Sequence, residues 1–457
     1  MATVEIGQPL GEQPEQRNPI GWLLVLGLMG LMVIGQFASS LDSRPSVSML
    51  RARIETRLES AILLQGMGGT SPEVTSPPTD SLASSAAELR PKITGDSEAT
   101  LLYAAIQTER KAKLEPSDLA ILRMAKDPVE KAAYEIYSST SLTPARAKEL
   151  ANLIPSTRFL YKLIAAHALE KGSLPGARGA LVGANEGKTK VGAGFAEVLL
   201  LLGGIVILVA YSSARQQRLL PTQGPVLKDL SGADADRLAL RAGQMFLAFL
   251  AVAYLMYKLL APVVSRDSMD VPVYVTILIV AFLLTKVPAT GKLISFRSLG
   301  MTSENLGRNI LWGACAAIAN LPIIAILQMA SYRLLSSFPA PEHPLKVEIT
   351  DTGSVAVIVQ LFLASVVLGP VLEEMIFRGT LFPAMSRVLK GPVWGAVASS
   401  LLFAAIHPTG VPLWPGLAAI GCMSCYIAYQ TKSLVPSITM HVLHNLITFV
   451  MTLILTR

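Results

Sequence analysis

The chain has 457 residues, of which 51% are hydrophobic and 16% charged, and its mean hydropathy is +0.49. This composition excludes a large soluble enzyme and predicts an all-α polytopic membrane protein. The net charge of +7 comes from basic residues spread over the ends of apolar runs, where the positive-inside bias also places them, so we expect no nucleic-acid partner. The cysteines Cys315, Cys422 and Cys425 all fall in apolar runs, so the sequence predicts no disulfide framework.

The N-terminal segment contains the first membrane anchor. Residues 1–19 are polar, contain three prolines and are expected to be disordered. Residues 20–38 are apolar and long enough to span a bilayer. A cleaved signal peptide is the alternative, but only Arg17 is basic before the run and no clean Ala-x-Ala site follows it. An uncleaved anchor is therefore the preferred interpretation.

A long hydrophilic insertion covers residues 39–194. Its part 66–98 is rich in Ser, Thr, Pro and Gly and is interpreted as a flexible linker. Helix-start signals recur after it, at Ser117, Asp127-Pro128, Thr143-Pro144 and Pro155-Ser156. They predict a small domain of four or five short helices over residues 99–175. This domain is either a site for a protein partner or for substrate gating, or a structural spacer, and the sequence does not decide between these.

Eight further spans follow the insertion, so the expected bundle has about nine. Membrane helices occupy residues 195–287, and a second group lies within residues 295–457. The individual spans are expected near 195–213, 239–264, 271–287, 309–334, 355–377, 393–407, 411–429 and 434–455. Basic residues flank alternate connections, which predicts a cytoplasmic N-terminus, with residues 39–194 outside, in a bacterial cell membrane.

Two adjacent carboxylates and a guanidinium lie in one apolar run. Glu374 and Arg378 are four residues apart, so on a helix they share a face and can neutralise each other. Glu373 points roughly 100° away from that pair. Because a lone charge in hydrocarbon is costly and usually functional, we expect Arg378 to hold Glu374 and Glu373 to do chemistry.

Histidines in the following spans are candidates to join Glu373. Counted from the turn at Gly391, Glu373 is 18 residues back and His407 is 16 residues forward, so both lie roughly 25 Å from that turn. His441 and Asn445 share a face of the last helix. His441 lies roughly 14 Å from its own connection at residues 431–433, so a tilt or kink is needed to bring it to the same depth.

Several kinds of chemistry fit this set. A carboxylate and an imidazole can hold and deprotonate a water, and a second imidazole with a carboxamide can donate to an oxyanion, as peptide hydrolysis requires. Zinc bound by Glu373, His407 and His441 is the alternative. A transporter or proton-relay protein could use the same residues. A non-catalytic membrane scaffold, with the outer domain as its working part, is the third interpretation.

The ordered motifs Glu373-Glu374-x-x-x-Arg378, Phe403-x-x-x-His407 and His441-x-x-x-Asn445 resemble those of the CAAX prenyl endopeptidase and bacteriocin-processing (CPBP, also called Abi) membrane proteases. The resemblance covers roughly residues 295–455 and not the N-terminal 290 residues.

The resemblance implies an endopeptidase acting on membrane proteins or lipidated, CAAX-like peptides within the bilayer. It further implies that Glu373 and His407 activate the water, that His441 and Asn445 form the oxyanion site, and that Glu374 and Arg378 support them. The family is commonly labelled metalloprotease. We favour a metal-free form, because a carboxamide such as that of Asn445 is a poor zinc ligand and a good donor. His444, outside the motifs, is interpreted as a packing residue or as a support for the catalytic residues, and not as a catalytic residue itself.

Overall fold

The computed structural model describes residues 18–41, 47–66, 78–155, 158–174, 181, 184–217, 231–260, 262, 269–289, 292–295, 297, 299–335, 338, 344–351 and 354–456. Its elements are helices, apart from the antiparallel pair of two-residue strands β1 (Pro288–Ala289) and β2 (Lys292–Leu293). The predicted all-α polytopic fold is therefore confirmed. The disorder predicted for residues 1–19 falls almost entirely outside the described part of the chain.

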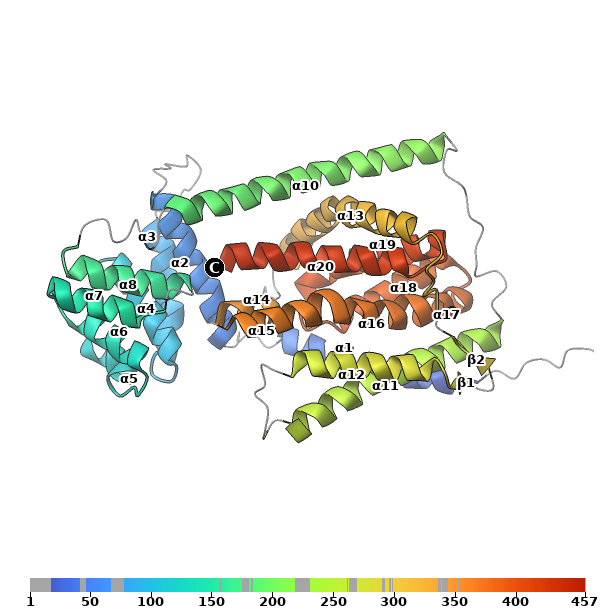
Figure 1. Ribbon diagram of the computed structural model, residues 1–457, viewed down its shortest axis with the longest axis horizontal. Coiled ribbons are helices and arrows are strands. Elements are labelled where there is room, and N and C mark those ends of the chain that lie inside the picture. The colour runs from blue at the N-terminus through green and yellow to red at the C-terminus, as the bar shows by residue number, and fades with distance from the viewer. Residues whose placement is uncertain are drawn as a thin grey trace, which may run out of the picture.

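The insertion after the first span folds into a helical domain at one end of the bundle (Figure 1). Its helices are α2 (Val47–Gly66), α3 (Pro78–Leu89), α4 (Ser97–Glu109), α5 (Ala120–Arg123), α6 (Pro128–Ser138), α7 (Pro144–Leu153) and α8 (Phe159–Lys171), with 3-10 turns η1 (Arg90–Lys92) and η2 (Pro116–Leu119). The side chains of Asp127 and Thr143 cap α6 and α7 by accepting bonds from backbone N–H groups, as the sequence predicted. One continuous apolar core joins α2 to α8.

The linker predicted over residues 66–98 differs from the structure. From Pro78 onward this segment is helical, as α3 and η1, and α4 begins at Ser97. Leu82, Ala86 and Leu89 lie at helical spacing and are buried in the domain core. Three small or apolar residues on one face outweighed the Ser and Pro content on which the linker prediction depended. Residues 67–77 lie outside the described part.

Seven helical segments in the described part are long and apolar enough to cross a membrane. They are 20–38 within α1 (Ile20–Leu41), 192–216 within α10 (Ala184–Gln216), α11 (Gly232–Leu260), α13 (Leu306–Leu334), the segment 355–388, η6 (Val411–Leu413) with α19 (Trp414–Thr431), and 435–455 within α20 (Val435–Thr456). The other two predicted spans are the shorter apolar helices α12 (Asp270–Leu284) and α18 (Pro392–Ala405). All nine predicted spans are thus helical, and two of them are shorter than a full crossing.

The segment 355–388 changes its helical type four times. It consists of α15 (Val355–Phe362), the π-helical turn η4 (Leu363–Leu368), α16 (Gly369–Ile376), the π-helical turn η5 (Phe377–Leu381) and α17 (Phe382–Val388). A proline follows each π turn, and its ring clashes with the carbonyl four residues earlier in an α-helix. Those carbonyls belong to Val366 and Gly379, which lie inside η4 and η5. The π turns absorb this clash, and they flank the short helix that carries both glutamates.

The bundle has two distinct ends (Figure 1). The domain α2–α8 lies at one end, where α14 (Pro344–Asp351) contacts α2. The β1–β2 pair and the α17–α18 connection lie at the other end, with the basic residues Lys292 in β2 and Arg387 and Lys390 beside that connection. This separation agrees with a domain on the side opposite the basic loops, and the orientation of the whole in the membrane stays a prediction.

Candidate active site

The expected ion pair is present on the helix between the two π turns. Arg378 Nη1 lies 3.0 Å from Glu374 Oε1, and both side chains are fully buried. The guanidinium also lies over the ring of Phe403, 4.6 Å from the ring centre, as in a cation–π contact. The N–H directions of Arg378 miss hydrogen-bond geometry within the described residues, so the pair is held by charge and packing.

Glu374 also reaches the last helix of the bundle. Its Oε1 lies 3.0 Å from Nδ1 of His441 on α20, and the carboxylate therefore accepts a hydrogen bond from this ring nitrogen. Since Nδ1 carries the proton, Nε2 of the neutral ring is an acceptor directed elsewhere. The sequence predicted a supporting role for Glu374 through Arg378, and the link to His441 was not foreseen.

Glu373 lies where two imidazoles converge. Its Oε2 is 3.9 Å from His407 Nε2 and 3.7 Å from His441 Nε2, and its side chain is 28% exposed. His407 Nδ1 donates to the carbonyl oxygen of Phe403 at 2.5 Å, so its Nε2 is also an acceptor. These separations exceed a direct hydrogen bond and are the kind that a bridging water spans.

The depths of the three residues can be read from the contacts of their helices. Glu373 and His407 meet across the α17–α18 hairpin, as counting from Gly391 predicted. A Cβ on Gly379 would lie 3.3 Å from Leu434 Cδ1, so α20 begins beside η5 and not at the level of the hairpin turn. Glu373 is six residues from Gly379 and His441 is seven from Leu434, or about 10 Å in each case. This deeper start of α20, which sequence counting missed, brings His441 level with Glu373.

Asn445 and His444 have other surroundings. The Asn445 side-chain nitrogen Nδ2 donates to the carbonyl oxygen of Ser365 at 2.8 Å, in the π turn η4. This bond ties α20 to η4, one turn beyond His441, and no described contact joins Asn445 to Glu373. His444 Nδ1 is buried without a hydrogen-bond partner among the described residues.

Phe403, which begins the second motif, and Tyr274, which the sequence did not single out, are neighbours of the site. The Phe403 ring centre is 4.5 Å from that of His407 and 5.7 Å from that of His441, so Phe403 packs against both imidazoles. Tyr274, on α12, approaches Glu373 over the backbone of Gly369. A Cβ atom built on Gly369 would lie 3.7 Å from Tyr274 Cε1 and 3.7 Å from Glu373 Oε1. An isolated Tyr in an apolar run carries no sequence signal for this approach.

The side chains of Glu373, His407 and His441 are of the types that bind zinc, but their donor atoms lie too far apart to reach one ion. A carboxylate oxygen and two imidazole nitrogens, each with its second nitrogen held by an acceptor, are typical zinc ligands. Ligands about 2 Å from one tetrahedral ion lie about 3.3 Å apart, whereas the separations from Glu373 Oε2 are 3.7 and 3.9 Å. Within the described residues, no group of three or more His, Cys, Asp or Glu side chains is placed to hold a metal ion. In this arrangement Glu373, His407 and His441 therefore do not fit a zinc ion.

A comparison with protein families gives one match. Residues 355–447, from the start of α15 into α20, match the family model described as type II CAAX prenyl endopeptidase Rce1-like. This stretch contains the Glu373, His407 and His441 motifs in full. Comparisons with curated proteins and with solved structures found no match.

Proposed function

We propose that this multi-pass membrane protein, whose residues 355–447 match the Rce1-like family of type II CAAX prenyl endopeptidases, is an intramembrane endopeptidase in which Glu373 activates a water. One observation carries the assignment of residues. The carboxylate of Glu373 faces the Nε2 atoms of two imidazoles, each of which is fixed by a partner at its other nitrogen. This arrangement can hold and deprotonate a water between Glu373 and His407.

In the proposed first step, the water donates one proton to Glu373 and the other to Nε2 of His407. As the water oxygen attacks the scissile carbonyl carbon, Glu373 takes up the proton, and it later gives this proton to the leaving amine. His407 directs the water because its ring is fixed by the Phe403 carbonyl. No covalent intermediate on the protein is needed.

His441 is proposed to stabilise the oxyanion in its protonated form. Its Nδ1–H is committed to Glu374, so only Nε2 can face the substrate, and Nε2 donates only from an imidazolium. The carboxylate of Glu374, 3.0 Å from Nδ1, would be the counter-charge of this form. The side-chain amide of Asn445 has two N–H groups, and one of them donates to the carbonyl oxygen of Ser365. The other N–H group is proposed to donate to the oxyanion.

The proposed substrates are membrane proteins or lipidated, CAAX-like peptides. The site lies between the segment 355–388 and α20, both long and apolar enough to cross a bilayer, and the shorter apolar helix α18, so a soluble peptide would have to leave water to reach it. An apolar guest enters such a site most readily.

Full-length protein purified in detergent tests the proposal with a library of prenylated and unprenylated peptides. Glu373→Gln should abolish cleavage, while Glu304→Gln, at an exposed ion pair near the start of α13, should leave it intact. Cleavage by Glu373→Gln at the wild-type rate would refute the assignment. Proton-coupled flux in liposomes without peptidase activity would favour the transporter. Loss of cleavage with a chelator, restored by zinc, would replace the metal-free form with the zinc form.

A further inference from the structure

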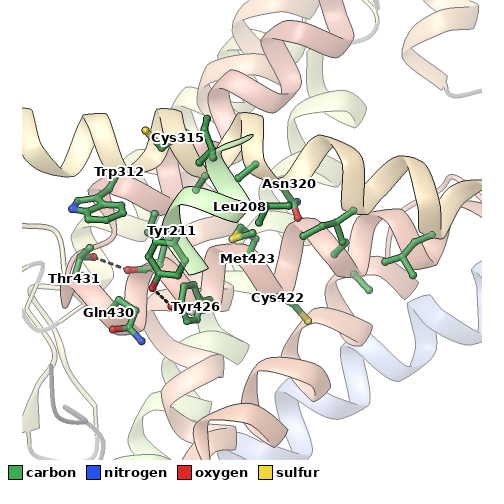
Figure 2. A pocket seen from close by; sticks show the side chains of 18 of the residues that line it. Leu208, Tyr211, Trp312, Cys315, Asn320, Cys422, Met423, Tyr426, Gln430 and Thr431 are labelled. Atoms are coloured by element: carbon green, nitrogen blue, oxygen red, sulfur yellow. Dashed lines mark hydrogen bonds between the residues drawn. The ribbon is translucent and has the colours of Figure 1, made fainter. Parts of the chain in front are cut away.

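A cavity of about 740 Å³ lies between α10, α13 and α19, outside the active site (Figure 2). Leu401 of α18 also lines it, whereas Phe403, two residues on, packs against the catalytic imidazoles. Two residues on a helix are about 200° apart, so the cavity and the active site lie on opposite faces of α18. Glu373, His407 and His441 are not among its lining residues.

One end of the cavity carries two cations. Arg215, in the last turn of α10, and Arg308, in the first turn of α13, both line the rim and are exposed. Neither has a hydrogen-bond or ion-pair partner in the described part of the chain. Both lie at the end of the bundle with the basic connections, where helix ends leave the hydrocarbon for water. The rim thus presents two positive charges at the depth of lipid headgroups.

Aromatic and polar side chains form the next layer. Tyr211 and Trp312 each lie one helical turn, about 6 Å, deeper than the two arginines. The hydroxyl of Tyr211 is hydrogen-bonded to that of Tyr426 on α19, and the Tyr211 ring lies edge-on to Trp312 (Figure 2). Tyr and Trp are the residues enriched at the membrane–water boundary, level with the glycerol region of a lipid.

Below this layer the wall is almost entirely apolar. Side chains such as Leu208, Ile323, Leu327 and Met423 line it. From Trp312 to Leu327 the cavity follows 15 residues of α13, or about 22 Å. The hydrocarbon of one leaflet is about 15 Å thick, so an acyl chain fits along this wall.

From this order of charge, aromatic layer and apolar wall, we propose that the cavity binds one anionic phospholipid of the surrounding bilayer. Arg215 and Arg308 hold its phosphate, Tyr211 and Trp312 border its glycerol, and an acyl chain runs along α13. A guanidinium is well suited to phosphate, because its planar array of N–H donors can bind two oxygens at once. The site would make lipid composition a determinant of how α10 is held on the catalytic bundle, independently of which peptide is cleaved.

Native mass spectrometry of the delipidated full-length protein tests this with phosphatidylglycerol and phosphatidylcholine as probes. Wild type should retain one phosphatidylglycerol at a concentration about tenfold lower than phosphatidylcholine. The double variant Arg215→Gln, Arg308→Gln should lose that preference. Arg333→Gln, which removes an exposed cation at the opposite end of α13, should keep it.

Two native cysteines locate the bound lipid. Cys315 and Cys422 line the cavity as free, partly exposed thiols, while Cys425 is buried and outside it. Phosphatidylglycerol should slow alkylation of the first two by N-ethylmaleimide and leave Cys425, the internal reference, unchanged. The protection should weaken as salt screens the arginines, a readout in wild type that does not require the double variant to fold.

The proposal is overturned if wild type binds the two lipids equally, or if the double variant folds and keeps its preference. It is also overturned if phosphatidylglycerol binds without protecting Cys315 and Cys422. Protection of these thiols by a prenylated peptide and not by phosphatidylglycerol would instead assign the cavity to the substrate's lipid tail. Neither lipid result depends on peptidase activity, so failure here leaves the proposed function untouched.

Discussion

The same substitution, Glu to Gln, made at either of the two adjacent glutamates should separate an effect on stability from an effect on catalysis. Glu373→Gln and Glu374→Gln each remove one negative charge and preserve side-chain shape. Glu373 is 28% exposed and its nearest charged partners are 3.7 and 3.9 Å away. Glu374 is fully buried and lies 3.0 Å from both Arg378 and His441.

The burial of the two glutamates and the distances to their partners determine how much each substitution should destabilise the protein. Glu374→Gln leaves the buried guanidinium of Arg378 without its counter-charge, and breaking such a pair costs about 3–5 kcal/mol. This should lower the unfolding temperature by roughly 5 °C or more. Glu373→Gln breaks no close ion pair, so its change should stay within about 0.5 kcal/mol, as for substitutions away from packed networks. Both variants should lose peptidase activity, Glu373→Gln because the base is gone and Glu374→Gln because the proposed cation of His441 loses its counter-charge.

Thermal unfolding in detergent, followed by tryptophan fluorescence, and cleavage of a fluorogenic peptide measure the two effects on the same preparations. Equal unfolding temperatures for the two variants would contradict the role of Glu374 as counter-charge to Arg378. Full activity in Glu374→Gln, with its stability reduced, would show that the contact with His441 is not used in catalysis.

Three further predictions concern stability outside the active site. Arg158→Met should cost about 3–5 kcal/mol in thermal unfolding, because it leaves Glu55, 2.8 Å away and nearly fully buried, without its counter-charge. Hydrogen bonding to Arg146 lowers the pKa of Glu135, so the stabilising effect of this pair is present above the unfolded-state pKa of about 4.3 and is lost as pH falls through the lower folded-state value. Wild type should therefore unfold at a slightly higher temperature than Glu135→Gln at neutral pH, and the difference should be small because both side chains of the pair are over a third exposed. The difference should vanish on acidification. A difference that grows as pH falls would contradict the expected direction. Asn320→Leu should raise stability by about 1–3 kcal/mol, because Nδ2 is a buried donor without a partner in the described part of the chain; destabilisation would mean that it has one.

The spans could be predicted because apolar length is a local property. The last span, expected at 434–455, is α20 at Val435–Thr456. The span expected at 239–264 begins earlier, as α11 at Gly232, because Asp236 accepts bonds from Trp22 and Asn18 of the first anchor. The charged residues before position 239 are therefore part of α11, because Asp236 is hydrogen-bonded to a segment far away in the sequence. The charges of residues 232–239 alone do not reveal such a partner.

The members of the candidate active site were predictable as residue types at set spacings, but their depths and partners were not. The ion pair of Glu374 with Arg378 follows from the i, i+4 rule. The level of His441 depends on the contact of Leu434 with Gly379, which helix counting does not contain. The bond of Asn445 to Ser365 requires the π turn η4, whose i to i+5 geometry leaves no clear mark in hydrophobic periodicity.

The adjacent residues Glu373 and Glu374 give one helical turn two different roles. On a helix, neighbours point about 100° apart, so Glu374 can face the buried guanidinium while Glu373 faces the partly open space beside His407. The charge of Arg378 is then matched by Glu374 and covered by the Phe403 ring, so Glu373 is not drawn into the ion pair. Through His441, the same structural carboxylate also fixes the second imidazole that Glu373 faces. A single glutamate could supply either the ion pair with Arg378 or the proposed base, and the proposed mechanism requires both at adjacent positions.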